Sequence, residues 1–436
     1  MIQGNIVEKM ANNKSLTNLQ KIILFVFVSF IMDLPEFIFK LIDLNTGLGL
    51  IKYTQVIIPF MFALYIITSN NGKRSHRSPH LTPFLLMAIG FVIFQEVHEL
   101  YIKDATYNGY SHFFWPQIRI YIYFLMLVSF GLNRVVFYKV IDYAFYSGLL
   151  ICLITYIGYL GFIEISYTGT GNPLAGSAFK SEDYRPGHAL HVNKVSFLFA
   201  FTILLFIIKQ LHERRFYKTQ FYRDFTILFM LLGLIIINAS RGAFLTAVVI
   251  ISYFIYHIWQ QGVMNRSTKR AILFLFLGST LVLLASSYIS KELISLTSQN
   301  NLTHRFQRDF EERNFVNLVR VTNIQNAWKN FIDHPFSGVG YYNAAKIGLR
   351  GSRSNNQYLQ VLASYGIIFF IIYMYYNFKL VVVRFELLKR PEVAICLIYH
   401  LMHIMFRVPT ERVAILGYIA IFFYYNSKTN VQIKKI

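Results

Sequence analysis

Apolar segments long enough to cross a bilayer recur along the whole chain and constrain its fold more than any other feature. A transmembrane helix needs about 20 largely apolar residues. Hydrophobic residues make up 55% of the chain and charged residues only 14%, against about 25% charged in an average soluble domain. We therefore expect an all-α fold, a polytopic membrane helix bundle of about 12 transmembrane helices. The predicted spans are 22–39, 50–68, 80–97, 117–132, 139–162, 194–209, 223–239, 242–258, 271–288, 357–377, 393–407 and 412–425.

The distribution of Lys and Arg predicts which way these spans face. The chain has 42 Lys and Arg against 21 Asp and Glu, a formal net charge of +21. Cytoplasmic loops of membrane proteins carry an excess of Lys and Arg, whereas long loops cross regardless of their charge. More than half of the basic residues lie in the alternating set of loops that includes both chain ends. We expect both termini in the cytoplasm, and no nucleic-acid partner.

Two long segments fall on the predicted external side. They are residues 161–193 and residues 289–356, and the second is long enough to contain helices of its own. No interdomain linker interrupts the sequence. Residues 1–436 are therefore predicted to form a single polytopic membrane domain, with a helical external cap built from the long loop.

The long loop contains the pattern of an amphipathic helix. Val321, Ile324, Trp328 and Phe331 follow the three- and four-residue spacing of one helix face, and polar residues lie between them. Such a helix lies at the membrane surface or packs on top of the bundle, and the pattern alone leaves both positions open.

Arginines on the predicted external side are not explained by the orientation rule. A permanently charged side chain in a short turn between spans is costly unless it meets water, a lipid phosphate or a ligand. One interpretation is that these side chains reach phospholipid head groups. The other is a shared anion site, since guanidinium groups bind phosphate oxygens bidentately. The arginines concerned are Arg185, Arg241, Arg320, Arg350 and Arg353.

The histidines carry less information than the arginines. His188 and His191 lack a clear third ligand, so we predict no metal site. His400 and His403 lie a turn apart in a late span and are expected to be core residues. His304 lies in a stretch of mixed charge in the long loop, which is typical of a solvated, charge-paired face.

Three ordered stretches in the second half of the chain carry a family resemblance. Together with the flanking spans they cover about Leu190 to Leu380 and resemble the common domain of the O-antigen polymerase and ligase family. The stretches are the Ser240-Arg241-Gly242 turn, the segment from Arg320 through Trp328 to His334-Pro335-Phe336-Ser337-Gly338-Val339-Gly340, and Ser354-Asn355-Asn356-Gln357-Tyr358-Leu359-Gln360 followed by Gly366.

The resemblance implies a membrane glycosyltransferase of the bacterial inner membrane that needs no cofactor. It implies undecaprenyl-diphosphate-linked oligosaccharides as donor and acceptor, with membrane lipids and a chain-length regulator protein as further partners. By resemblance, Arg185 and Arg241 hold the donor diphosphate, and Arg320 matches the long-loop arginine; these three are the candidate catalytic residues. Fixed cations there would stabilise the charge that develops on the leaving diphosphate. The candidate substrate-binding residues are His188, Asn193, Arg353, Asn355, Asn356 and Tyr358.

One position departs from the family pattern. Asn355 replaces the histidine that ligases have in the His-Asn-x-Tyr-Leu segment, and an amide does not take up a proton near neutral pH. This favours a polymerase over a ligase and leaves the general base unassigned. A transporter is the alternative from another class, and a non-catalytic membrane scaffold also stays open. The candidate bases, by location only, are His188, His191, His304 and Glu312.

Overall fold

The described part of the chain is built from helices. The computed structural model describes residues 16–41, 90, 93, 94, 97, 98, 114–159, 192–213, 218–237, 240–260, 315–340, 356–406 and 410–433. No strand occurs among these residues, which confirms the predicted all-α class. The elements are α2 (Asn18–Ile31), α3 (Leu34–Leu41), α6 (Phe114–Ser129), α7 (Arg134–Tyr159), α9 (Val192–Glu213), α10 (Lys218–Ile237), α11 (Arg241–Gln260), α14 (Phe315–Asp333), α16 (Gln357–Val381), η3 (Phe385–Lys389), α17 (Pro391–Phe406) and α18 (Val413–Ile433).

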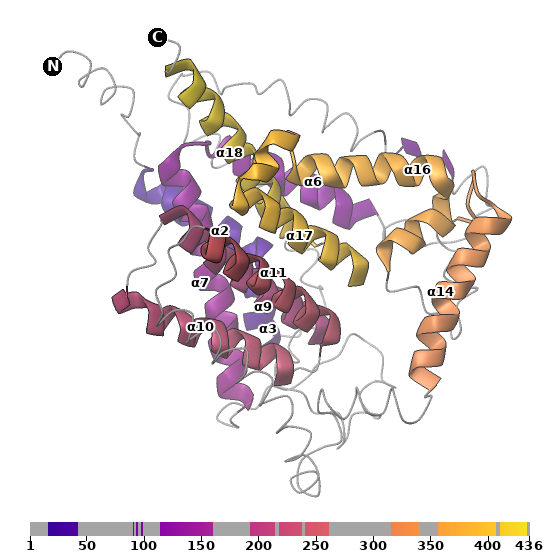
Figure 1. Ribbon diagram of the computed structural model, residues 1–436, viewed down its shortest axis with the longest axis horizontal. Helices are drawn as coiled ribbons and strands as arrows, with labels where there is room; N and C mark the ends of the chain where they lie inside the picture. Colours follow the sequence, from indigo (N-terminus) through magenta and orange to yellow (C-terminus); the bar gives the residue numbers. More distant parts are fainter. Residues whose placement is uncertain are drawn as a thin grey trace, which may run out of the picture.

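Helix α9 lies at the centre of the bundle. It packs against α7, α10, α11 and α17, and most of its length is buried. One continuous apolar core joins these helices with α2, α6 and α18. A smaller cluster of Val361, Tyr365, Phe369 and Tyr373 lies along α16. Helix α14 packs against α16 at the outer edge of the molecule, away from α9 (Figure 1).

Apolar helices occur at the positions of the predicted spans wherever the chain is described. Helices α7, α9 and α16 are long and apolar enough to cross a membrane, judged by length and composition. Shorter apolar helices occur in α2, α6, α10, α11, α17 and α18. The predicted spans 50–68 and 271–288 lie outside the described residues, so the number twelve is not confirmed. The fold is a helical membrane bundle.

The first predicted span, residues 22–39, is two helices and not one. Helix α2 ends at Ile31 and α3 begins at Leu34. Between them Asp33 has φ 62°, the left-handed region that side chains other than glycine seldom adopt. Asp is among the residues that tolerate this conformation best. The break turns the Asp33 carboxylate into the bundle, where 8% of the residue remains exposed.

The predicted amphipathic segment lies in α14, and its sides differ from one another. Asn323, Ala327 and Asn330 are buried, whereas Ile324 and Trp328 remain exposed. The helix therefore turns polar and small side chains toward the protein and leaves Ile324 and Trp328 outside.

Candidate functional site

Several of the predicted site residues fall outside the described part of the chain. For Asn193, Arg241 and Arg320 the structure places the backbone: Asn193 lies in the first turn of α9, Arg241 begins α11, and Arg320 lies in α14. Whether these arginine side chains converge stays a prediction. The residues outside the described ranges are Arg185, His188, His191, His304, Glu312, Arg350, Arg353 and Asn355.

The Ser240-Arg241-Gly242 turn is tightly held against α9 and α17. Ser240 is buried, and its carbonyl accepts a hydrogen bond from Phe244 N at 2.9 Å, which starts α11. A Cβ on Gly242 would lie 2.9 Å from Phe406 Cγ and 3.3 Å from Phe197 Cζ, so only glycine lets the three helices approach so closely. This contact fixes the start of α11, and with it the Arg241 backbone, beside the beginning of α9.

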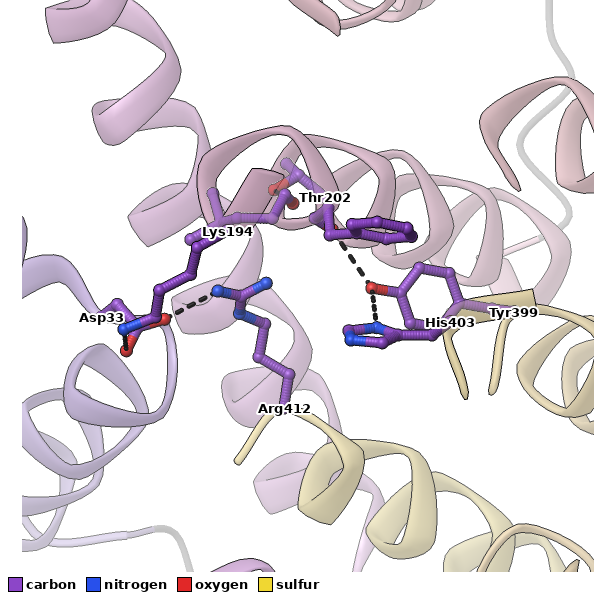
Figure 2. A network of polar contacts seen from close by, with 8 residues as sticks. Asp33, Lys194, Thr202, Tyr399, His403 and Arg412 are labelled. Atoms are coloured by element: carbon purple, nitrogen blue, oxygen red, sulfur yellow. Dashed lines mark hydrogen bonds and ion pairs between the residues drawn. The ribbon is translucent and has the colours of Figure 1, made fainter. Parts of the chain in front are cut away.

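A buried ionic cluster lies near the same end of α9. Asp33 accepts from Lys194 Nζ at 2.9 Å and from Arg412 Nη2 at 2.7 Å, and the three residues come from the α2–α3 break, the start of α9 and the turn before α18 (Figure 2). Arg412 is 1% exposed. Two cations thus share one carboxylate, and the cluster carries one net positive charge.

Arg412 does not use all of its donors on Asp33. Its Nε and Nη1 atoms are buried and have no hydrogen-bond partner within the described ranges. A buried guanidinium that is only partly hydrogen-bonded is costly. An additional anionic or carbonyl acceptor at these atoms would offset that cost.

A second polar group joins α9 to α17. The Tyr399 hydroxyl donates to the Phe197 carbonyl at 3.1 Å, and it lies 3.1 Å from His403 Nδ1 (Figure 2). Because the hydroxyl has one proton and donates it to Phe197, Nδ1 must be the donor in the second bond. His400 is also buried, and neither of its ring nitrogens has a hydrogen-bond partner in the described part of the chain. Both histidines are core residues, as predicted.

Removing the Tyr399 hydroxyl should weaken the contact between α9 and α17. Tyr399→Phe loses two hydrogen bonds at a buried position, so we expect a destabilisation of about 1–3 kcal/mol. The apparent midpoint of thermal unfolding in detergent measures the effect. Tyr375→Phe, at a residue that is 54% exposed, is the matched control and should leave the midpoint unchanged.

Two predicted substrate-binding residues also hold α16 in place. The Asn356 side chain accepts from Leu359 N at 3.2 Å and caps the start of α16. The Tyr358 hydroxyl donates to the Leu401 carbonyl of α17 at 3.2 Å. The segment that carries Asn356 and Tyr358 is thereby fixed beside α17, and substrate binding by these residues stays a prediction.

The His334–Gly340 turn docks onto a break in α16. Gly366 interrupts α16 with φ 78° and ψ −178°. Three backbone hydrogen bonds join the turn to the break: Val339 N to Ala363 O at 2.9 Å, Gly340 N to Ser364 O at 2.9 Å, and Ile367 N to Pro335 O at 2.8 Å. A broken helix at membrane depth needs such partners for its freed backbone groups. The glycine-rich His334–Gly340 turn therefore supplies hydrogen-bond partners for the break in α16.

The ionic cluster was not predicted from the sequence. Its signal was the presence of charged residues, Asp33, Lys194 and Arg412, in or near span ends that the orientation rule places on one side. Opposite charges at span ends of the same side are candidates for pairing, but hydropathy does not indicate which ends are neighbours. The cluster shows that these three ends lie on the same side of the bundle, and their predicted external location stays a prediction.

Comparison with known proteins supports the resemblance seen in the sequence. Residues 226–374 match the family model described as O-Antigen ligase. Comparisons with curated proteins and with solved structures find no match. The matched range begins in α10, includes the Ser240-Arg241-Gly242 turn, α14 and the docked glycine-rich turn, and ends within α16. The chain therefore contains an O-antigen ligase-type domain, which supports the predicted resemblance to the O-antigen ligase and polymerase family of membrane enzymes.

Proposed function

We propose that the protein is an O-antigen polymerase of the bacterial inner membrane. It transfers the growing glycan from undecaprenyl diphosphate onto a new lipid-linked repeat unit at the periplasmic face. No metal is needed, because arginines hold the donor diphosphate.

The observation that carries this proposal is the buried Arg412, whose Nε and Nη1 atoms have no hydrogen-bond partner among the described residues. Arg412 lies in the turn before α18, which meets the start of α9, and it shares the Asp33 carboxylate with Lys194. The start of α11 lies beside them, which brings the Arg241 backbone to the same end. Helix N-termini add partial positive charge. A diphosphate is the kind of group that such a place would bind.

The reaction follows from the chemistry of the donor. The acceptor hydroxyl oxygen bonds to the anomeric carbon of the donor glycan, and the bond from that carbon to the diphosphate oxygen breaks. Undecaprenyl diphosphate leaves with the electron pair, and the hydroxyl proton passes to a base. Fixed cations stabilise the charge that grows on the leaving group.

A ligase is the second candidate, because the matching family model is described as O-Antigen ligase. We favour the polymerase since Asn355 occupies the place of the ligase histidine. Deletion of the gene separates the two. Loss of a polymerase leaves lipopolysaccharide with a single repeat unit, whereas loss of a ligase leaves lipid A-core without any attached glycan repeat. A transporter is disfavoured by the family match.

Replacing either predicted clamp arginine should abolish chain growth. Arg241→Ala and Arg185→Ala each remove a cation from the developing diphosphate charge, and we expect polymerisation to fall by roughly 100-fold or more. Gel profiles of polysaccharide from complemented cells, at matched protein levels, measure this. Arg134→Ala, at an exposed arginine of the opposite end of the bundle, is the control. Unchanged glycan length in the Arg241 and Arg185 variants would contradict the clamp.

A further inference from the structure

Helix α14 has three faces of different character. Asn323, Ala327 and Asn330 form a buried face toward α16. A second face is apolar and exposed: Ile324, Trp328 and Ile332 are 43%, 51% and 57% exposed. A third face is polar and exposed and consists of Gln325, Lys329 and Asp333. Residues four apart share a helix face, so each set forms a stripe along the helix.

This division distinguishes α14 from a helix that only packs on a bundle. Such a helix buries its apolar stripe against the protein and turns its polar stripe to water. In α14 the protein-facing stripe contains two asparagines, and three large apolar side chains point away from the protein. An exposed apolar surface with a Trp at its centre, beside a charged stripe, is typical of an interfacial helix.

The apolar stripe of α14 continues onto the outer surface of a membrane span. Phe336, three residues after the end of α14, is 71% exposed, and the carbonyl of its neighbour Pro335 accepts from Ile367 N of α16 at 2.8 Å. From there Ile368, Ile371, Ile372 and Tyr375 continue along α16, each at least 41% exposed. α16 is one of the helices long and apolar enough to span the membrane, so its exposed isoleucines face lipid.

We infer that α14 is an interfacial helix whose Ile324–Trp328–Ile332 stripe inserts into the outer surface of the bilayer. The stripe lies at the boundary between head groups and acyl chains, and Lys329 and Asp333 face water. The docked His334–Gly340 turn connects this helix rigidly to the break in α16. Contact with lipid thereby fixes the height of the long-loop helix relative to the bundle.

Fluorescence quenching by lipid tests the inference directly. The chain has three tryptophans, and Trp115→Phe with Trp259→Phe leaves Trp328 as the only one. In proteoliposomes, acyl chains brominated near the head group should quench Trp328 about twofold or more relative to lipid without bromine. Aqueous iodide should have little effect. The matched control adds Trp328→Phe and Lys329→Trp, which moves the reporter to the water face, and should show the reverse pattern.

A second measurement uses spin labels on the otherwise natural chain. Both native cysteines are buried, so a label reacts selectively with Ile332→Cys or Lys329→Cys. The power saturation of the label should respond to oxygen at position 332 and to a water-soluble nickel chelate at position 329. Equal access of iodide to tryptophans at positions 328 and 329, or of nickel to labels at positions 332 and 329, would overturn the inference. Protection of Trp328 from lipid and water alike would also overturn it and indicate contact with a second protein chain.

Discussion

Replacing Gly366 by alanine should prevent the long-loop turn from docking and destabilise the protein by at least about 3 kcal/mol. Its φ of 78° with ψ of −178° belongs to glycine alone, and a Cβ there would collide with the Phe336 carbonyl. The three backbone hydrogen bonds between the His334–Gly340 turn and α16 would then be lost or strained. We expect a lower apparent unfolding midpoint in detergent and loss of glycan transfer.

Gly233→Ala is the matched control for this prediction. Gly233 lies inside α10, and a Cβ there would meet nothing within 4 Å. Alanine favours the helix by about 1 kcal/mol over glycine, so this variant should be as stable as the natural chain or slightly more stable. Equal midpoints for the Gly366 and Gly233 variants would show that the docked break does not contribute to stability.

Replacing Asp33 by asparagine should be equally damaging, for an electrostatic reason. The amide keeps the size of the side chain but leaves Lys194 and Arg412 without their shared negative charge. Removing one partner of a buried ion pair costs about 3–5 kcal/mol, because the remaining charge is uncompensated. The apparent unfolding midpoint should therefore fall sharply.

The Lys209–Asp142 pair provides the control for Asp33. Its nitrogen and oxygen lie 2.6 Å apart, but both side chains are partly exposed, at 21% and 25%. Asp142→Asn should cost at most about 1 kcal/mol. The double variant Asp33→Asn with Arg412→Gln should recover part of the lost stability. It removes the buried Arg412 charge that Asp33→Asn alone would leave uncompensated. A similar effect of Asp33→Asn and Asp142→Asn would argue against an essential buried cluster.

The sequence was sufficient for the helices because they depend on local composition, whereas the side of the membrane that each loop faces stays a prediction. Runs of apolar residues predicted α7, α9 and α16, whereas the break at Asp33 falls inside a predicted span. The cluster confirms that separate span ends, expected on one side, lie together. These predictions need only the hydrophobic thickness of the bilayer and the bias of Lys and Arg.

Contacts between residues far apart in the chain could not be predicted from the sequence. Asp33 and Arg412 are 379 positions apart, and no periodicity connects them. The inward side of α14 was also missed, since burying Asn323 and Asn330 depends on how the helix packs against α16. Gly366 was visible in the motif, but its purpose appears only with the turn that approaches it.

Reconstitution with a single kind of substrate tests the proposed polymerase most directly. The purified protein in proteoliposomes receives undecaprenyl-diphosphate-linked repeat units and no lipid A-core, and the lengths of the lipid-linked glycans are measured. We predict a ladder of longer glycans with release of undecaprenyl diphosphate, and none with Arg241→Ala. Glycans that stay at one unit until lipid A-core is added, and then appear on that acceptor, would contradict the polymerase and identify a ligase.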